Sequence, residues 1–540
     1  MDHSRLISKA QTKFKPSKGA LFFLLLFLIF SPKDLIWADA LRLVYPKAPV
    51  SLDPQRYPPD PAAWPVIMTC YRRLFDLEPA SSVLDNKNSA AATYRVSEDG
   101  LLYTFILKEG QSFPDGTLLD SYAALYSFDR LMSTQTGSIY FPRLKFFEIV
   151  GPHTFRFRLD SPWPPFLASL TSPMASLISP SLSARPSGYL DQHSLGSGGF
   201  EVDSVEPTLI KLKIRSDAQV IPKLDRIEFY YNEDPQKRYA LFIENQAHLA
   251  WQPQYTSPLD NRFELIKVTS FETKFLAFNL LRPYLKMDGA RELITDLAAS
   301  ALSLSGERVK PVGFFPAGLA PSLPVGAPPS AAELEKRAVQ LLSTLGPSRI
   351  PLDLVYQADD PSGRSDAEVL ASKLSAHGLA VRLVPLSGAH GQGILEKGDW
   401  DMLLDFRRPE YPSPEMWLGG FLDSRATIKS NPARFNDSQV DQLIEGLSTQ
   451  NNMTRESLLR RLNVYALEKR PYVMLYQKTF DMLIDKRLSN IRPHPMWPQV
   501  WPIEQINLDP FKAQPKVKAP EAPSVPLIQS FDHPVAEPYE

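Results

Sequence analysis

A short stretch in the C-terminal half of the chain combines residue types that bind charged small molecules. It runs from Asp399 to Ser424, begins with apolar residues typical of a buried strand, and continues into a turn that holds Arg407, Arg408, Glu410 and Tyr411. A carboxylate binds an ammonium through a charge-assisted hydrogen bond, and a guanidinium binds a carboxylate or a phosphate. Because α/β folds gather ligand-binding groups beyond the ends of their strands, this turn is a candidate ligand site. An ordinary surface loop explains the same residues equally well.

The sequence lacks the motifs of the common catalytic and metal centres. It has no HExxH, GxSxG or GxxxxGK[ST] motif and no paired CxxC, and its eight histidines are scattered. The glycine-rich run at 196–199 is followed by strand-like residues rather than a helix, so it predicts a tight turn and not a phosphate-binding loop. Asp359 and Asp360 lie in a polar stretch and predict a solvated turn. We expect neither catalysis nor a metal or cofactor.

The composition is that of a large globular protein. With 540 residues, of which 44% are hydrophobic and 22% charged, the chain is long enough for several domains with cores of their own. The 59 lysines and arginines balance the 60 aspartates and glutamates, which argues against a nucleic-acid partner. The single cysteine, Cys70, cannot form an internal disulfide, and its apolar neighbours predict a buried and inert thiol.

Residues 1–40 are organised like a secretory signal peptide. Basic residues precede the apolar run from Gly19 to Phe30, and Ala38 and Ala40 provide the small side chains of a cleavage site. The apolar run is shorter than the roughly 20 residues of a membrane-spanning helix. An uncleaved membrane anchor is the alternative. At the other end of the chain, residues 511–540 are rich in proline and polar residues, which predicts a disordered tail.

Two regions show the clearest secondary-structure patterns. Residues 93–131 predict two strands around the turn Glu98-Asp99-Gly100, a second turn at 113–117, and a helix capped by Asp120. From Ala331 to Leu404, helical and strand-like segments alternate. That alternation is typical of a parallel sheet covered by helices, and its last strand leads into the candidate ligand turn.

Several motifs, taken in order, resemble one family: the exported solute-binding proteins of ABC importers, family 5, which handle oligopeptides, dipeptides and nickel chelates. The block at 94–117 is the most specific, because it is similar to the family's W-x-VS-x-DGLTYTF strand pair and F-x-DG-x-P signature. The resemblance extends from about residue 41 to residue 507. The other matching motifs are the SLDP turn at 51–54, the glycine run at 196–200, the strand at 275–279, and Asn436 with Asp441 before a late helix.

The resemblance implies an α/β fold: a two-lobed periplasmic-binding-protein fold of type II, with an extra inserted domain and a hinge between the lobes. Two crossing strands would join the lobes, which close around the ligand like a clamshell. The implied boundaries are 41–52, 166–268 and 479–510 for lobe I, 53–165 for the inserted domain, and 269–478 for lobe II.

In peptide-binding members of the family, a carboxylate in the tract D-Y-x-[DE]-P pairs with the peptide's α-ammonium, and backbone groups hold the peptide as an added strand. The resemblance places Glu410 in that position. The tract departs from the family pattern at Ser413, where an acidic residue is usual, and at Arg407 and Arg408, where aromatic or small residues are usual. The arginines suit an anionic ligand or a peptide held partly by its carboxylate. An ion pair of these arginines with Asp405 or Glu410 is the alternative.

The resemblance therefore implies a periplasmic protein that captures a peptide or similar small solute and delivers it to the permease of an ABC importer. We expect a monomer that is not an enzyme. Tyr411, Trp417 and Tyr45 are further candidates for ligand contacts, although aromatic residues at such positions also build cores. The alternative function is that of a degenerate family member, anchored in the membrane through residues 1–40, that acts as an envelope interaction protein without a transport role.

Overall fold

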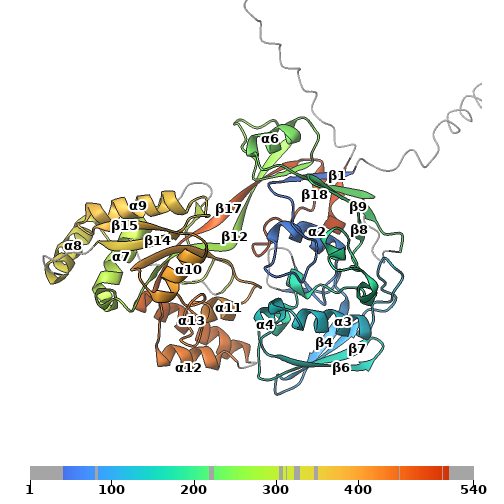
Figure 1. Cartoon of the computed structure of the whole chain (residues 1–540), viewed down its shortest axis with the longest axis horizontal. Helices are drawn as coiled ribbons and strands as arrows, with labels where there is room; N and C mark the ends of the chain where they lie inside the picture. The colour runs from blue at the N-terminus through green and yellow to red at the C-terminus, as the bar shows by residue number, and fades with distance from the viewer. Residues whose placement is uncertain are drawn as a thin grey trace, which may run out of the picture.

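The chain folds into two lobes joined by a pair of long strands (Figure 1). The computed structural model of the protein describes residues 40–78, 83–217, 224–302, 308–311, 313–320, 329–345, 351–448, 451–501 and 503–509. The predicted signal peptide, apart from Ala40, and the predicted tail lie outside the described residues. The two-lobed α/β architecture expected from the sequence is confirmed.

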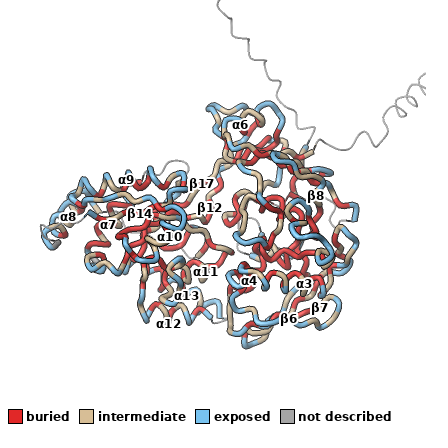
Figure 2. The backbone as a smooth tube through the Cα atoms, viewed as in Figure 1, coloured by how far each residue is buried: buried red, intermediate tan, exposed pale blue. Residues whose placement is uncertain are grey.

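A mixed sheet of 11 strands extends through both lobes of the described chain. Its order is β15-β14-β16-β12-β17-β11-β1-β10-β9-β8, and the short β13 (Arg308–Val309) pairs with β17 beside this path. The central strands are β12 (Phe263–Phe278) and β17 (Tyr472–Asp485), which run antiparallel and pass from one lobe to the other (Figure 1). Both are buried over much of their length (Figure 2).

The first lobe is built around β1 (Leu41–Tyr45), which lies between two parallel strands. Leu41 and Leu43 are fully buried, as expected of a central strand. Its neighbours are β10 (Arg226–Tyr231) and β11 (Leu249–Trp251), and β9 (Leu209–Ile214) and β8 (Phe200–Glu206) extend the sheet to its edge. The helices of this lobe are α5 (Phe166–Ser169) and α6 (Pro235–Ile243). Helix α2 (Trp64–Cys70) packs beside β8, although it falls within the segment 53–165 that is expected to form the inserted domain.

The backbone of the glycine-rich run at 196–199 passes close to the end of α2, and β8 begins directly after the run. The Gly198 amide donates to the Cys70 carbonyl at 2.9 Å. A Cβ atom on Gly196 would lie 2.3 Å from the same carbonyl oxygen, so this approach requires glycine. Burial raises the pKa of the Cys70 thiol to about 12. As predicted, the run leads into a strand rather than a helix, and Cys70 is buried.

The second lobe contains the parallel strands that the alternating pattern predicts. Leucines and valines of β14 and β16 are buried on both faces, because helices cover the sheet. The strands are β14 (Leu352–Gln357), β15 (Val381–Leu386) and β16 (Met402–Arg407). The helices are α7 (Asp288–Ala301), α8 (Ala331–Leu345), α9 (Gly363–Ala376), α10 (Gly388–Lys397), α11 (Pro414–Gly419), α12 (Ser438–Gly446) and α13 (Asn452–Lys469).

The inserted domain contains a four-stranded antiparallel sheet with the order β4-β5-β7-β6. Gly100 and Gly116 have φ angles of 69° and 81° in the two predicted turns, and the Asp120 side chain accepts hydrogen bonds from the first amides of the predicted helix. Buried phenylalanines pack in this domain, among them Phe105 and Phe157, whose rings meet edge to face. The elements are β4 (Ala91–Val96), β5 (Leu102–Leu107), β6 (Leu144–Gly151), β7 (Thr154–Leu159), α3 (Ser121–Met132) and α4 (Gln135–Tyr140).

Short elements complete the described chain. They are β2 (Asp76–Leu77), β3 (Leu84–Asp85), β18 (Leu488–Ser489), β19 (Asn507–Leu508) and the 3₁₀ turns η1 (Pro61–Ala63), η2 (Pro173–Ala175), η3 (Pro180–Ala184), η4 (Tyr189–Asp191), η5 (Pro283–Lys286) and η6 (Ile503–Gln505).

The pairing of β12 with β17 is interrupted where the strands pass between the lobes. Thr269 pairs with Thr479 and Thr273 with Gln477, so the three residues between the two threonines bulge out of the ladder. The Gln477 side chain donates to the Ser270 carbonyl at 3.0 Å and holds this bulge. A bulge bends a strand and weakens its pairing locally, which suits the position of a hinge.

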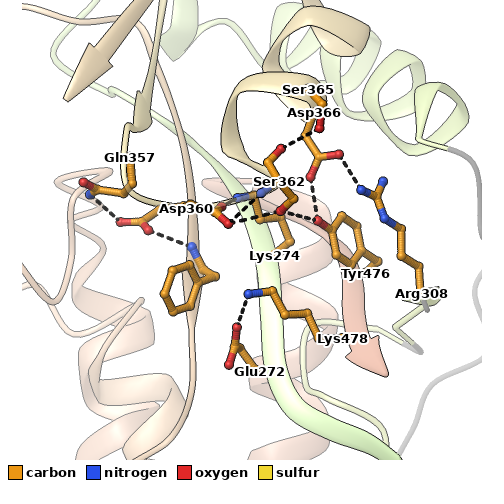
Figure 3. Close-up of polar contacts among 12 residues, drawn as sticks. Glu272, Lys274, Arg308, Gln357, Asp360, Ser362, Ser365, Asp366, Tyr476 and Lys478 are labelled. Carbon is orange, nitrogen blue, oxygen red and sulfur yellow. Dashed lines mark hydrogen bonds and ion pairs between the residues drawn. The ribbon is translucent and has the colours of Figure 1, made fainter. Parts of the chain in front are cut away.

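A buried polar network lies beside this bulge in the second lobe (Figure 3). The Lys274 ammonium on β12 forms an ion pair with the Asp360 carboxylate, and both side chains are essentially inaccessible, at 0% and 1% exposed. Burial alone would raise the pKa of Asp360, but the Lys274 charge and the Ser362 amide bring it below its usual value. The prediction that Asp360 lies in a solvated turn is therefore wrong. The turn after β14 lies against β12, and its Asp360 carboxylate there provides the counter-charge for the buried Lys274 ammonium.

Substituting Lys274 tests whether this ion pair fixes β12 to the second lobe. Lys274→Met leaves the Asp360 carboxylate buried without its partner and should lower the free energy of unfolding by roughly 3–5 kcal/mol. The double variant Lys274→Met/Asp360→Leu should recover most of that loss. Denaturant unfolding of both variants gives the comparison. Lys267→Met, which affects an ion pair at the exposed end of β12, is the control and should cost less than about 1 kcal/mol. If Lys274→Met lowered the free energy of unfolding no more than Lys267→Met does, the ion pair would not fix β12 to the second lobe.

Candidate ligand site between the lobes

The candidate turn follows β16 directly and has little conformational freedom. Pro409 restricts Arg408 to extended backbone, and the next two prolines limit the chain before α11. The Ser413 hydroxyl accepts a hydrogen bond from the Met416 amide at 3.3 Å and caps α11. The 408–411 turn is thus held between a buried strand and a capped helix.

Glu410 lies at the contact between the two lobes. The phenol of Tyr140, the last residue of α4, donates a hydrogen bond to Glu410 Oε2 across 270 residues of sequence. Burial raises the pKa of Tyr140, and the nearby Glu410 charge raises it further, so the phenol keeps its proton and donates. Figure 1 shows α4 at the edge of the first half of the molecule that faces α11. The sequence-predicted carboxylate therefore faces the inserted domain.

Two aromatic contacts flank this hydrogen bond. The Arg408 guanidinium lies 4.4 Å from the centre of the Trp64 ring, at the start of α2. The Tyr411 ring meets Trp163 edge-on, with 6.0 Å between ring centres. Arg408, Glu410 and Tyr411 thus each contact a residue of the first half of the molecule. We call these six residues, Trp64, Tyr140, Trp163, Arg408, Glu410 and Tyr411, the inter-lobe contact.

Arg407 has a different role from Arg408. Its guanidinium donates to the carbonyls of Gly420 and Lys429, the latter at 3.1 Å, and lies 4.2 Å from the centre of the Phe421 ring. Burial lowers the pKa of Arg407. Within the described chain, neither Arg407 nor Arg408 forms an ion pair with Asp405 or Glu410, the alternative considered from the sequence. Arg407 ties the strand to the segment after α11, and it also lines a cavity described below, so its contact with ligand stays a prediction.

Trp417 and Tyr45 are held in the cores of separate lobes. Trp417 is fully buried, and its indole N–H donates to the Phe314 carbonyl at 3.0 Å. Tyr45 is 5% exposed, donates to the Gln499 carbonyl at 2.9 Å, and stacks on Trp501. These contacts stabilise the lobes, and a binding role for either residue remains a prediction that no contact supports.

The structure adds Trp64, Tyr140 and Trp163, which the sequence analysis did not select. Trp64 sits in an apolar helical pattern that predicts core packing, and Tyr140 and Trp163 belong to no motif. Each becomes a candidate because the fold brings it against the 408–411 turn from another part of the chain. Position in the fold, rather than local sequence, identifies them.

A cavity of about 320 Å³ lies beside the turn, at the carboxyl ends of β14, β15 and β16. This is where ligand-binding groups gather in α/β folds. Burial raises the pKa of Asp405, which lines the cavity and accepts a hydrogen bond from the Gln357 side chain at 3.1 Å. The other lining residues include Phe406, Lys429 and Glu396. A cavity is therefore present beyond the strand ends of the second lobe. Of the predicted residues of the turn, Arg407 lines it, whereas Arg408, Glu410 and Tyr411 do not.

The inter-lobe contact provides a carboxylate, a guanidinium and aromatic rings, which suits binding of a charged organic solute. In the part of the chain that the structure describes, no group of three or more histidine, cysteine, aspartate or glutamate residues is placed to hold a metal ion. A search of the described helices for one that is apolar and long enough to cross a bilayer found none.

The fold defines a class: two-lobed α/β proteins whose lobes are joined by a pair of long strands. The sequence profile of the family described as "Bacterial extracellular solute-binding proteins, family 5 Middle" matches residues 87–428. The chain belongs to this family.

Individual relatives agree with that assignment. The chain is 25% identical over 485 residues to the "Probable D,D-dipeptide-binding periplasmic protein DdpA" of Escherichia coli (strain K12), covering 84% of this chain and 92% of that protein. It is 26% identical over 269 residues to the "Glutathione-binding protein GsiB" of Salmonella paratyphi A, covering 47% of this chain and 52% of that protein.

Solved structures show the same fold at low sequence identity. The structure of HbpA2 from Haemophilus parasuis matches with a TM-score of 0.75 at 18% identity, covering 87% of this chain and all of that one (100%). The crystal structure of a dipeptide binding protein from Pseudoalteromonas sp. SM9913 in complex with Met-Leu matches with a TM-score of 0.70 at 17% identity, with the same coverage of 87% and 100%.

Removing the Tyr140 hydroxyl tests whether its hydrogen bond to Glu410 holds the lobes together. A hydrogen bond to a charged group contributes about 1.5–3 kcal/mol, so Tyr140→Phe should shift the free protein toward more open arrangements. Spin labels on cysteines introduced at Leu118 and Met453, which are 60% and 84% exposed, report the distance between the inserted domain and the second lobe. We expect longer distances in the variant. Tyr122→Phe, at an exposed tyrosine, is the control. If Tyr140→Phe gave the same distribution of spin-label distances as the wild type, the hydrogen bond would not hold the lobes together.

Proposed function

We propose that this protein captures a peptide-like solute with a free amine between its lobes and delivers it to the permease of an ABC importer. Membership of the extracellular solute-binding family supports the transport role. The relatives named for D,D-dipeptides and for glutathione, and the neighbour solved with Met-Leu, support a peptide-like ligand. The observation that carries the proposal is the position of Glu410, a carboxylate on a rigid turn at the contact between the lobes.

Binding at this position follows from simple electrostatics. An ammonium that reaches the Glu410 carboxylate forms a charge-assisted hydrogen bond in a partly dry site, where such bonds are strong. Trp64, Trp163 and Tyr411 offer apolar surface around it. The ligand would thus bridge the two halves of the molecule and stabilise the closed arrangement. Binding and release, without chemistry on the solute, are the whole cycle that we propose, and a monomer suffices for it.

The division of the chain into lobes is part of the proposal. The boundaries at 268/269 and 478/479 fall at the pairing of Thr269 with Thr479, where the ladder of β12 and β17 is interrupted. Lobe closure would then bend β12 and β17 at this pair of residues. The inserted domain, proposed as 53–165, carries Tyr140 and Trp163 and moves with lobe I.

Export of the chain is tested by fractionation of cells that produce the full chain. We expect the protein in the periplasmic fraction with residues 1–40 removed, because this segment has the organisation of a signal peptide. Mass spectrometry of the N-terminus checks the cleavage. A protein found in the membrane fraction, with residues 1–40 intact and no bound solute, would favour the anchored envelope interaction protein over the transport protein.

Glu410→Ala tests the ammonium site directly. The variant should bind free-amine dipeptides more weakly by about 2–5 kcal/mol, since the ammonium would lose its buried counter-charge. The N-acetylated forms of the same peptides should bind wild type and variant alike. Isothermal titration calorimetry against L-Ala-L-Ala, D-Ala-D-Ala and glutathione measures both effects.

The matched control is Glu445→Ala, because Glu445 is an exposed carboxylate of the same lobe in an ion pair with Arg425. It should leave all affinities unchanged. Free-amine and N-acetylated peptides that bind Glu410→Ala as tightly as wild type would remove Glu410 from the site. A wild-type protein that binds no peptide in the panel and yields no solute on purification would contradict the proposed function.

A further inference from the structure

A cavity of about 100 Å³ lies in the first half of the molecule and is separate from the inter-lobe contact. The residues that line it come from the end of α2, from the β2–β3 segment that follows, from Gly198 and from the segment 492–505. Among the described residues that line it, none belongs to 269–478, the proposed second lobe, and none belongs to the inter-lobe contact. Lobe closure is therefore not needed to form this cavity.

Three residues that line this cavity carry a buried N–H donor without an acceptor. The donors are the indole N–H groups of Trp497 and Trp501 and the Nε–H group of Arg73, and none has a hydrogen-bond partner among the described residues. The three residues are 3%, 4% and 3% exposed, so bulk solvent does not replace the missing partners. Buried donors in native proteins almost always have a partner. An acceptor that enters the cavity would provide it.

Contacts within the chain already use the neighbouring polar groups. Arg72 donates to the carbonyls of Ser197, at 2.9 Å, and Asn88. The Asp76 carboxylate accepts from a terminal nitrogen of Arg73, which leaves the Nε–H of that guanidinium free. Among the described lining residues, the buried side-chain atoms without a partner are thus all donors. Such a site selects a ligand that accepts hydrogen bonds and disfavours an ammonium, which only donates them.

A small carboxylate fits these donors best. Arg73 is charged, and a charged donor binds an anionic oxygen more strongly than a neutral donor does. The exposed Arg492 also lines the cavity, and no hydrogen bond or ion pair joins its guanidinium to another described residue. Apolar side chains form the rest of the wall and suit a hydrocarbon tail. They belong to Met68, Leu77, Val500 and Ile503.

The volume of the cavity limits the length of the ligand. About 10–15 Å³ is enough to hold one water molecule, and an engineered apolar cavity of about 150 Å³ binds benzene. The cavity of about 100 Å³ therefore accommodates a molecule somewhat smaller than benzene, such as an aliphatic acid of about three or four carbons. A dipeptide is too large for it.

We propose that this cavity is a second ligand site, in which Trp497, Trp501 and Arg73 bind the carboxylate of a short aliphatic acid. Arg492 attracts the acid from the surface, and the apolar wall contacts its tail. The site does not depend on the proposed function, because it shares no residue with the inter-lobe contact.

Nuclear magnetic resonance of the indole N–H groups tests the site on the donors themselves. The protein is produced with nitrogen-15-labelled tryptophan, and Trp497→Phe and Trp501→Phe assign the two signals. Titration of wild type with butyrate should shift both signals saturably. The signal of Trp417 should stay in place, because its indole N–H already donates to the Phe314 carbonyl at 3.0 Å. Butyramide, which lacks the charge, should bind about tenfold more weakly or worse.

Two variants measure the contributions of single groups. Trp501→Phe keeps an aromatic ring and removes the N–H, so butyrate binding, followed through the Trp497 signal, should weaken about tenfold or more. Arg492→Gln removes an exposed charge at the cavity and should weaken binding about threefold. Arg364→Gln, at an exposed arginine of the second lobe, is the matched control and should leave butyrate binding unchanged.

Three results would overturn this inference. The first is that the signals of Trp497 and Trp501 do not move with butyrate. The second is an equal shift with sodium chloride or inorganic phosphate at the same concentration, since the site would then take any anion. The third is loss of butyrate binding in Glu410→Ala, since butyrate would then occupy the inter-lobe contact. The proposed function would stand in the first two cases, because peptide binding is measured separately.

Discussion

The antiparallel pairing of β12 with β17 is the constraint on which the rest of the structure depends. These strands form the centre of the sheet and extend into both lobes. Their ladder is regular from Phe263 to Thr269, is interrupted at the bulge, resumes at Thr273, and shifts register once more between Lys274 and Phe275. Beyond the bulge, the fully buried ion pair of Lys274 with Asp360 fixes β12 to the turn after β14. We therefore expect β12 and β17 to bend most easily at the bulge. Ladder hydrogen bonds hold the strands on one side of it, and the buried ion pair holds β12 on the other.

The pairing of β16 with β12 places the candidate ligand site beside the bulge. Arg407, the last residue of β16, pairs with Thr273, the first residue after the bulge. The 408–411 turn thus leaves the sheet beside the point where the lobes can bend. In the closure that we propose, a small rotation there would carry the 408–411 turn toward or away from Trp64, Tyr140 and Trp163. A ligand held by both sets of residues gains its affinity from the closed arrangement and stabilises it in return.

Local sequence patterns predict many of the elements of this fold. Alternating patterns predicted the parallel strands of the second lobe, and turn residues predicted the hairpin and capped helix of the inserted domain, because these signals act between near neighbours. Family motifs selected Glu410. The partners of Glu410 could not be selected in this way, since Tyr140 lies 270 residues away and belongs to no motif. Asp360 was misjudged for the same reason: its polar neighbours predict solvent, and its counter-ion Lys274 comes from a distant strand.

A crystal structure of the protein soaked with a free-amine peptide to which it binds in solution tests the central claim most directly. We expect the ligand between the 408–411 turn and α4, with its ammonium nitrogen within hydrogen-bonding distance of the Glu410 carboxylate. A ligand bound elsewhere would contradict the account. The clearest such case is the cavity of about 690 Å³ on the hinge that Arg308 and Lys478 line, with the Glu410 carboxylate still bonded to Tyr140 alone.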